Sequence, residues 1–465
     1  MLEYVKEKAG VNMEKRRNFI QITLITFVTY FIMSQMYYTQ IYLMAEYYSG
    51  TTIFAITDGW AYLMQALGML VMIALFNKKP QIYGNKVFVS GAMVAMIPLI
   101  IVSVLVKSGA VIFAMMLILN FVIGFATAFY FGLMVQYLPQ NNRLMSFAIA
   151  YALGTIAMWA LSKVSANILT SNYIILVDIV LVIFNVYLFM SFENLNSSCN
   201  PNDKVSSLSL SSVIKSNKSL IAIVFLMSVL SVLGSSDNVA LTNDEVGLSI
   251  LDVRALYGIG LITCAWIYAK NKGIGSIVTM ASLVLPFVAL GMLHVAYASV
   301  IVCLITFIAL GFYSVYRAGV FMDITSELNL IPVFAVFGLA VSRISDAVTV
   351  VAFTYLYPKY FPVSFIVSGI VFIPLIILFF ASFIKNGNMI EDADTKKSLF
   401  AETHDLTRRE EEIAHYISQG KTNGEIASLI NLSESTVRFH VANILKKTGL
   451  RSRTDVSRAY HKAHK

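Results

Sequence analysis

Charged residues are scarce in this sequence. They make up 13% of the 465 residues, whereas 58% are hydrophobic, and an ordinary soluble domain is roughly one quarter charged. The scarcity is uneven, because long apolar runs alternate with short polar joints up to about residue 384 and the chain turns polar after Lys385. This pattern excludes a single soluble globular protein. It predicts an integral membrane part followed by a small soluble part.

Groups that carry out chemistry are also missing. The three cysteines, Cys199, Cys264 and Cys303, fit no metal-binding or disulfide spacing. No pair of carboxylates, nucleophile motif or phosphate-binding loop stands out in the sequence. We therefore expect no metal, no cofactor and no enzymatic activity.

The membrane part contains about twelve apolar runs that can each cross a bilayer, which takes roughly 20 residues. Several joints are so short that a count of ten or eleven stays open. The predicted spans are 18–42, 52–76, 87–106, 110–136, 145–165, 172–192, 219–237, 251–269, 274–294, 296–316, 332–356 and 361–384.

Lysine and arginine concentrate in alternate joints, and cytoplasmic loops retain these residues. With the N-terminus inside, the inner segments hold Lys6, Lys8, Lys15, Arg16, Arg17, Lys78, Lys79, Lys86, Arg143, Lys204, Lys215, Lys218, Lys270, Lys272 and Arg317. The outer joints hold only Lys107, Lys163, Arg254 and Lys359. The bias predicts a multi-pass membrane protein with both termini in the cytoplasm.

One long polar joint, residues 193–218, divides the spans into six and six. The chain is thus expected to consist of a cytoplasmic segment 1–17, membrane halves 18–192 and 219–385 joined by that loop, a linker 386–403 and a soluble domain 404–465. Two six-helix halves joined by a cytoplasmic loop resemble the major facilitator superfamily. In the loop "LFNKKPQIYGNKV", Gly84 and Lys86 echo the end of a signature of that superfamily, but its acidic residue is missing.

Ionisable residues within spans are costly and usually serve a cavity or a partner. The stretch "GLAVSRISDAVTVV" places Arg343 and Asp346 three residues apart on one helix face. They form either a pair that neutralises itself and locks the packing, or a site where Arg343 faces a cavity and binds an anionic ligand. Asp58 is either a cavity acid near Trp60 or a side chain that reaches outward to the membrane surface.

The C-terminal part shows three helix starts. "TRRE" and "TNGE" each place a threonine, Thr407 or Thr422, three residues before a glutamate. This spacing forms a capping box, in which the hydroxyl and the carboxylate each bind a backbone N–H at the start of a helix. Ser433 is the expected N-cap of a third helix, and Gly449 is suited to its C-terminal end.

The motifs "LTRREEEI" and "GKTNGEIASLINLSESTVRFHVANILKKTGLRSR" closely resemble the LuxR-type helix-turn-helix domain over about sixty residues. The resemblance implies a four-helix domain that binds double-stranded DNA as a homodimer. Its third helix would enter the major groove and its fourth would pair two copies. The fold class expected for the whole chain is therefore all-α, a membrane helix bundle with a small DNA-binding domain.

Arg438 is the expected base-reading residue of the third helix, because a guanidinium can pair with guanine through two hydrogen bonds. Phe439 is expected to contact a thymine methyl group, and Ala442 to allow close approach. The expected phosphate contacts, which fix register rather than read sequence, are Thr422, Asn423, Ser435, Thr436, Lys446 and Lys447.

The sequence leaves no room for a phosphoacceptor receiver or a soluble signal-binding domain, so any control should come through the membrane part. The whole chain resembles bacterial membrane-bound LuxR-family transcriptional regulators. We predict a one-component regulator that senses an unknown small molecule in a cavity of the membrane part and binds promoter DNA with its last domain. The alternative is a major-facilitator-type transporter with a regulatory tail that binds DNA or a partner.

Overall fold

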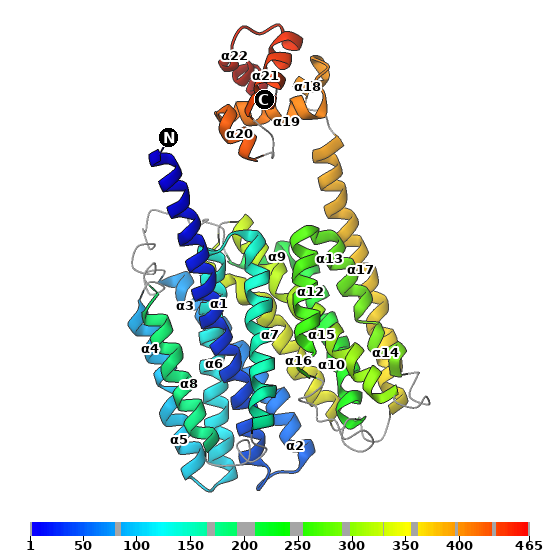
Figure 1. The fold of residues 1–465 in the computed structure, drawn as a ribbon. Helices are drawn as coiled ribbons and strands as arrows, with labels where there is room; N and C mark the ends of the chain where they lie inside the picture. The colour runs from blue at the N-terminus through cyan, green and yellow to red at the C-terminus, as the bar shows by residue number, and fades with distance from the viewer. Residues whose placement is uncertain are drawn as a thin grey trace. The chain divides into compact units, whose positions relative to one another are not determined.

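The chain folds into helices that form two compact units, Met1–Phe379 and Phe380–Lys465 (Figure 1). The computed structural model describes residues 2–79, 85–164, 173–192, 210–241, 254–290, 298–328, 330–354, 361–395, 399–429 and 434–463. Every regular element in these ranges is helical. We call the first unit the membrane unit and the second the small domain.

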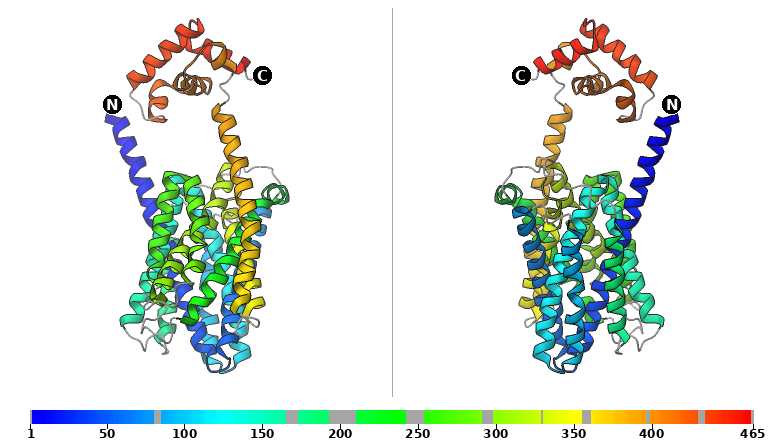
Figure 2. Two further views of the ribbon diagram at one scale, coloured as in Figure 1. Left: turned by 90° about the vertical axis from the view of Figure 1, so that its right-hand side faces the viewer. Right: turned by 90° about the vertical axis from the view of Figure 1, so that its left-hand side faces the viewer.

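The helices of the membrane unit run roughly side by side in all three views (Figures 1 and 2). The first half consists of α1 (Leu2–Met44), α2 (Gly50–Phe54), the π-helix η1 (Ala55–Trp60), α3 (Ala61–Lys78), α4 (Lys86–Val94), α5 (Met96–Leu105), α6 (Gly109–Tyr137), α7 (Gln140–Val164) and α8 (Tyr173–Met190). After α9 (Leu210–Ser216), the second half consists of α10 (Lys218–Leu241), α12 (Tyr257–Lys270), α13 (Lys272–Ser282), α14 (Leu285–Leu290), α15 (Ala298–Glu327), the 3-10 helix η4 (Pro332–Val336), α16 (Phe337–Thr354) and α17 (Phe361–Thr395).

Among the described residues, eight helices are long and apolar enough to cross a membrane, and three shorter apolar stretches lie at Ile175–Met190, Lys218–Gly234 and Lys272–Phe287. With α12, which has 14 residues, these stretches overlap the twelve predicted ranges, and the count of twelve spans stays a prediction. The expected segment 1–17 is not separate from the first span, because α1 already begins at Leu2.

Large apolar side chains cover the outside of the membrane unit. On α17, Ile366, Ile370, Ile373 and Ile377 are each between 62% and 64% exposed. They recur at spacings of three and four residues and so form one stripe along the helix. Such a stripe is unfavourable in water and suits contact with lipid.

Glycines bring two pairs of helices into backbone contact. A Cβ atom on Gly124 of α6 would lie 2.0 Å from the Gln65 carbonyl oxygen of α3, and one on Gly68 would lie 2.1 Å from the Phe121 oxygen. In the second half, a Cβ atom on Gly260 of α12 would lie 2.2 Å from the Ile308 oxygen of α15. These pairs are spans two and four, and spans eight and ten, so the close crossing occurs at the same place in each half.

A second feature repeats between the halves. Asn85 caps α4 by accepting a hydrogen bond from the Phe88 amide, and Asn271 caps α13 in the same way through Ile274. A lysine follows each asparagine. Lys86 donates to the carbonyl oxygens of Met190, the last residue of α8, and of Phe192, and Lys272 forms an ion pair of 2.6 Å with Asp323. The lysine expected from the superfamily signature therefore binds the end of a neighbouring helix.

The main contacts between the two halves are those of α7 with α12, of α6 with η4 and of α3 and η1 with α16. Ala152 of α7 lies 3.0 Å from the Cβ position of Gly258 in α12. Near the end of α15, Asp323 accepts a hydrogen bond of 2.8 Å from Gln140 of α7. One continuous apolar core extends through both halves.

The small domain contains α18 (Leu399–Thr403), α19 (Arg408–Ser418), α20 (Asn423–Leu429), α21 (Glu434–Thr448) and α22 (Arg453–Ala463). Phe400 and Ala401 are buried in its core beside Ile413 and Tyr460. The expected linker 386–403 is therefore largely helical, because α17 extends to Thr395 and α18 packs into the domain. This segment has too few apolar residues for a helical period to be recognised in its sequence.

We predict that Gly124→Ala destabilises the membrane unit by about 1–3 kcal/mol, because the added methyl group would overlap backbone atoms that cannot turn away. The measurement is the fraction of monodisperse protein that remains after heating in detergent. Gly91→Ala in α4 is the matched control, since nothing lies within 4 Å of the Cβ position there. Equal heat resistance of the two variants would contradict the close crossing.

Candidate functional site

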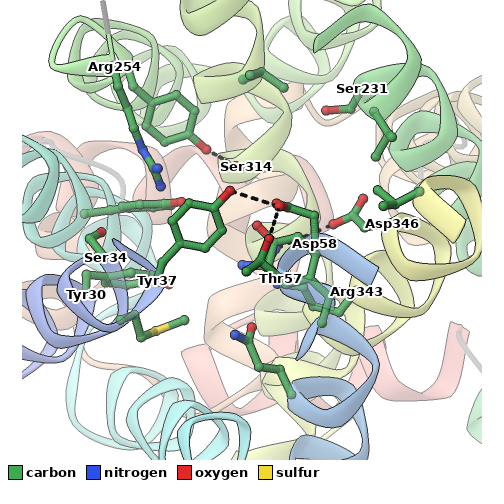
Figure 3. A pocket seen from close by; sticks show the side chains of 18 of the residues that line it. Tyr30, Ser34, Tyr37, Thr57, Asp58, Ser231, Arg254, Ser314, Arg343 and Asp346 are labelled. Atoms are coloured by element: carbon green, nitrogen blue, oxygen red, sulfur yellow. Dashed lines mark hydrogen bonds and ion pairs between the residues drawn. The ribbon is translucent and has the colours of Figure 1, made fainter. Parts of the chain in front are cut away.

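The membrane unit encloses a cavity of about 250 Å³ that is lined by both halves (Figure 3). Its charged lining residues are Asp58, Arg254, Arg317, Arg343 and Asp346. Its aromatic hydroxyls come from Tyr30, Tyr37, Tyr62, Tyr151, Tyr257 and Tyr313. The volume is slightly below the range of about 300–1,000 Å³ that is typical of pockets for drug-sized ligands. The cavity therefore suits a small molecule.

Asp346 of α16 lies between two arginines. Its Oδ2 atom is 3.7 Å from Nη1 of Arg343 and 3.7 Å from Nη1 of Arg317, and Ser228 of α10 donates a hydrogen bond to Oδ1. Arg317 also donates to the Ser342 hydroxyl at 3.0 Å. The predicted pair of Arg343 and Asp346 is thus present, and Arg317 extends it to a triad. The shared carboxylate lowers the cost of burying the two guanidinium groups.

Arg343 also links the two halves. Its guanidinium carbon lies 3.8 Å from the ring centroid of Tyr62 in α3, a distance at which the cation is attracted to the ring face. The two alternatives for Arg343 are thus not exclusive in the structure, because it lines the cavity and is also held by Asp346 and Tyr62.

Asp58 lies on the π-helix η1 and lines the cavity, whereas Trp60 is 48% exposed. Its Oδ2 atom accepts hydrogen bonds from Tyr37 at 2.9 Å and Thr57 at 2.8 Å, as the dashed lines in Figure 3 show. The π-helical turn is a rare element that often occurs at functional sites. Asp58 thus lies on the cavity wall, and its role there stays a prediction.

Sequence reasoning missed Arg254 and Arg317 as cavity residues. It assigned both to joints between spans, whereas both line the cavity. The reason for Arg317 is that α15 continues to Glu327, while the apolar run ends at residue 316. Arg254 donates to the Tyr38 hydroxyl at 3.3 Å, and its guanidinium lies 5.9 Å from the Tyr37 ring. Arg254 lies within the predicted span 251–269, and an arginine inside a span is the signal that could have marked it as a cavity residue. Arg317, which follows the span 296–316, had no such signal.

A chain of amides crosses the cavity wall between three helices. Gln65 of α3 donates to Asn120 of α6 at 2.8 Å, and Asn120 donates to Gln40 of α1 at 3.3 Å. At the two ends of the chain, Gln65 Oε1 and Gln40 Nε2 are buried and have no hydrogen-bond partner among the residues that the structure describes. The chain holds the helices together and leaves one acceptor and one donor beside the cavity.

Within the described ranges, no group of three or more His, Cys, Asp or Glu side chains is placed to hold a metal ion.

In the small domain, α21 has one exposed and one buried face. Arg438, Phe439, Ala442 and Lys446 are all exposed, whereas Val437 and Ile444 are fully buried in the core. The spacing of the exposed residues places them along one side of the helix. Phe439 is 63% exposed, which is unusual for a large apolar side chain and leaves its ring accessible to a partner.

The Arg438 guanidinium is held only loosely. Its Nη2 atom lies 2.6 Å from Glu434 Oε1, one turn earlier, and the two side chains are 69% and 50% exposed. An exposed pair of this kind contributes roughly 0–1 kcal/mol. Arg438 can therefore exchange Glu434 for another partner at little cost.

The predicted phosphate contacts lie at helix starts or on α21. Thr422 forms the capping box of α20 with Glu425, and Asn423 Oδ1 accepts a hydrogen bond from Arg453. Ser435 and Thr436 lie in the first turn of α21. The expected N-cap Ser433 lies outside the described residues. Amides at a helix start favour anions, so this arrangement is compatible with the predicted contacts.

Lys447, one of the expected phosphate contacts, already has partners inside the small domain. Its ammonium donates to Glu410 Oε2 at 2.8 Å and to the Asp405 carbonyl oxygen at 3.0 Å. Glu410 is also the carboxylate of the α19 capping box with Thr407. Two of the three N–H donors of the ammonium are thus used inside the domain. Lys447 joins the end of α21 to the start of α19, and its contact with phosphate stays a prediction.

The small domain matches a known family. Residues 404–460 match the family described as bacterial regulatory proteins, luxR family. The nitrate/nitrite response regulator protein NarP of Escherichia coli is 48% identical over 48 residues, which are 10% of this chain and 22% of that protein. The transcriptional activator protein ExpR of Dickeya dadantii is 48% identical over 45 residues, which are 10% of this chain and 18% of that protein. The matches thus span about one fifth of these relatives, and the small domain is a LuxR-type helix-turn-helix domain.

The membrane unit has the fold of solved transporters. The crystal structure of the nucleoside transporter NupG superposes with a TM-score of 0.54 at 13% identity, covering 79% of this chain and 99% of that one. The major facilitator superfamily transporter FucP in the outward conformation gives a TM-score of 0.54 at 12% identity, covering 78% of this chain and 97% of that one. The expected all-α fold class with a major-facilitator-like membrane part is confirmed, and at this identity the likeness concerns the fold alone.

We predict that Glu410→Gln lowers the free energy of unfolding of the small domain by about 1.5–3 kcal/mol, the usual contribution of a hydrogen bond to a charged group. Burial of Glu410 raises its pKa, but the hydrogen bonds from Lys447 and Thr407 outweigh this effect, so the pKa lies below its ordinary value. Urea unfolding of residues 399–465, followed by circular dichroism, measures the change.

The pH dependence of that difference follows from the lowered pKa of Glu410. The stabilisation is complete above about pH 4.3, the ordinary pKa of glutamate, and is lost as the pH falls through the lower pKa of the folded domain. The variant and the wild type should therefore converge at low pH. Glu412→Gln is the control, because its pair with Arg409 is 40% exposed on both sides. A loss as large in the control as in Glu410→Gln would refute the structural role of Glu410.

Proposed function

We propose that this protein is a membrane-bound one-component transcription regulator. It resides in a bacterial cytoplasmic membrane with both termini in the cytoplasm, binds a small molecule in the cavity of the membrane unit, and binds promoter DNA through the small domain. DNA-bound chains pair through that domain.

The observation that carries the proposal is the exposed face of α21. The core of the small domain requires the buried face of α21. The stability of the domain does not require the exposed face to carry Arg438, Phe439, Ala442 and Lys446 together. In a major groove, a guanidinium or an aromatic ring can contact bases and an ammonium can bind phosphate, while a small side chain allows close approach. The relatives matched over this domain are named as regulators, which supports the same conclusion.

The cavity supports control by a ligand. Residues of both halves line it, and the Arg343–Tyr62 and Arg254–Tyr38 contacts cross from one half to the other. A ligand shifts the arrangement of the halves only if it binds one arrangement more tightly than another. A difference of a few kcal/mol is sufficient for a clear change in population.

A second candidate function is transport with a regulatory tail. It is favoured by the membrane unit, which has the complete fold of NupG and FucP and retains a charged cavity. Uptake into vesicles that contain the purified protein separates the candidates. Accumulation of a molecule that binds the cavity would support the transporter, whereas binding without accumulation would support the sensor.

We predict that Arg438→Ala weakens binding to the cognate promoter by about 1–3 kcal/mol, the contribution of a guanidinium that reads a base. Sites are first identified by sequencing the DNA that is bound to the native protein in cells. Gel-shift titration of full-length protein in detergent then gives the affinity for such a site and for unrelated DNA.

Arg409→Ala is the charge-matched control, since it removes one positive charge from α19, where no DNA contact is predicted. The control should lower the affinity for both DNAs slightly and equally. An Arg438→Ala protein that still binds the cognate site as tightly as the native protein would remove α21 from sequence recognition.

A further inference from the structure

The charges on the cavity wall do not balance. Among the described lining residues, three arginines stand against two aspartates, which leaves an excess of one positive charge. An ionisable group inside a membrane protein is costly unless it has a partner. The arginine without a carboxylate partner therefore indicates what the cavity binds.

Arg317 and Arg343 have their partners already. Both share the Asp346 carboxylate at 3.7 Å. Each guanidinium also faces a tyrosine ring, that of Tyr313 at 5.0 Å for Arg317 and that of Tyr62 at 3.8 Å for Arg343. Both guanidinium groups are thus held by the protein itself, although they share one negative charge.

Arg254 differs from the other two. Within the described part of the chain it makes no ion pair with a carboxylate; its one hydrogen bond is to the Tyr38 hydroxyl, and its guanidinium lies 5.9 and 6.0 Å from the rings of Tyr37 and Tyr38. Asp58 instead accepts a hydrogen bond from the Tyr37 hydroxyl (Figure 3). A guanidinium has five N–H donors, so most of its donors are free to bind a ligand.

The rest of the wall suits an uncharged, mostly apolar body. Apolar side chains from both halves line it, among them Phe54, Ile123, Phe307, Leu310 and Val350. The rings of Tyr30 and Tyr151 stack at 4.3 Å, and this stack makes one flat side. The free ends of the amide chain, Gln40 Nε2 and Gln65 Oε1, add one donor and one acceptor.

We propose that the cavity binds a small organic monoanion, a carboxylate with an apolar body about the size of one ring, and that Arg254 binds its carboxylate group. A planar guanidinium and a carboxylate match through two parallel hydrogen bonds. The proposal rests on the proposed function, because it names the ligand class of the same cavity. It also gives the ligand a way to act, since a carboxylate on Arg254 competes with Tyr38 of the other half.

The test compares acids with their neutral amides. Benzoate, salicylate, hexanoate and cyclohexanecarboxylate, each beside its primary amide, are titrated at up to millimolar concentration into purified full-length protein in detergent, and calorimetry records binding. We expect at least one acid to bind while its amide does not. Binding of none of the acids, or equal binding of acid and amide, would overturn the proposal.

Variants locate the site. Arg254→Gln should weaken binding of that acid at least tenfold, whereas Arg254→Lys, which keeps the charge but loses the planar fork, should weaken it less. Lys107→Gln removes a positive charge outside the cavity and should leave binding unchanged. If Arg254→Gln does not fold, Arg254→Lys and the acid–amide comparison still decide the outcome. Unchanged affinity in both Arg254 variants would exclude this residue as the carboxylate partner.

The proposal and the proposed function can fail separately. Calorimetry involves no DNA, so binding of an acid by a protein that regulates no gene would leave the ligand class intact and remove the regulator. If regulation depends on Arg438 but the protein binds none of the acids, the regulator stands and the proposed ligand class fails.

Discussion

The centre of the membrane unit depends on one shared carboxylate. Asp346 is surrounded by Arg317, Arg343 and the Ser228 hydroxyl, which come from α15, α16 and α10. Removing charges from water is costly, and the cost is recovered only when each group has close partners. This requirement draws three helices of the second half together and, through the Arg343 guanidinium on the Tyr62 ring, holds them against the first half. The polar cavity exists beside this cluster.

The glycine crossings determine which parts of the membrane unit can move. Within each half, α3 with α6 and α12 with α15 touch through backbone atoms, so neither pair can slide without a clash. Between the halves, Arg254 with Tyr38 and Arg343 with Tyr62 are side-chain contacts at the cavity, and Gln140 with Asp323 is a side-chain contact near the end of α15. Side chains can change partners at modest cost, whereas packed backbones cannot. Sliding within these two helix pairs is therefore restricted, and the contacts that can rearrange at lowest cost are side-chain contacts between the halves.

The sequence was sufficient for the helices and for the small domain, and insufficient for the cavity. Spans follow from apolar runs, and the LuxR-type motifs follow from caps and spacing, which are local properties. The pairing of Arg343 with Asp346 was also local, because the two lie one helical turn apart. Arg254 and Arg317 were assigned to joints, because hydropathy records the charge of a residue and not the helices that surround it. The burial of Phe400 could not be predicted for a similar reason, since it depends on residues distant in the sequence, such as Tyr460. Lys447 was predicted to contact phosphate because its charge is a local property, whereas its ion pair with Glu410 joins residues that are 37 positions apart.

The π-helical turn of η1 has a consequence for how related chains should be compared. A π-helical turn holds one more residue than an α-helical one, and each residue turns an α-helix by about 100°. An α-helical turn in its place would hold one residue fewer, so a chain that lacks one residue between Ala55 and Trp60 keeps Tyr62 and Gln65 on the cavity side of α3. What changes is the turn itself, which places Asp58 on the cavity wall. Related chains should therefore be aligned with a one-residue gap at this segment before the polar residues of the span are compared.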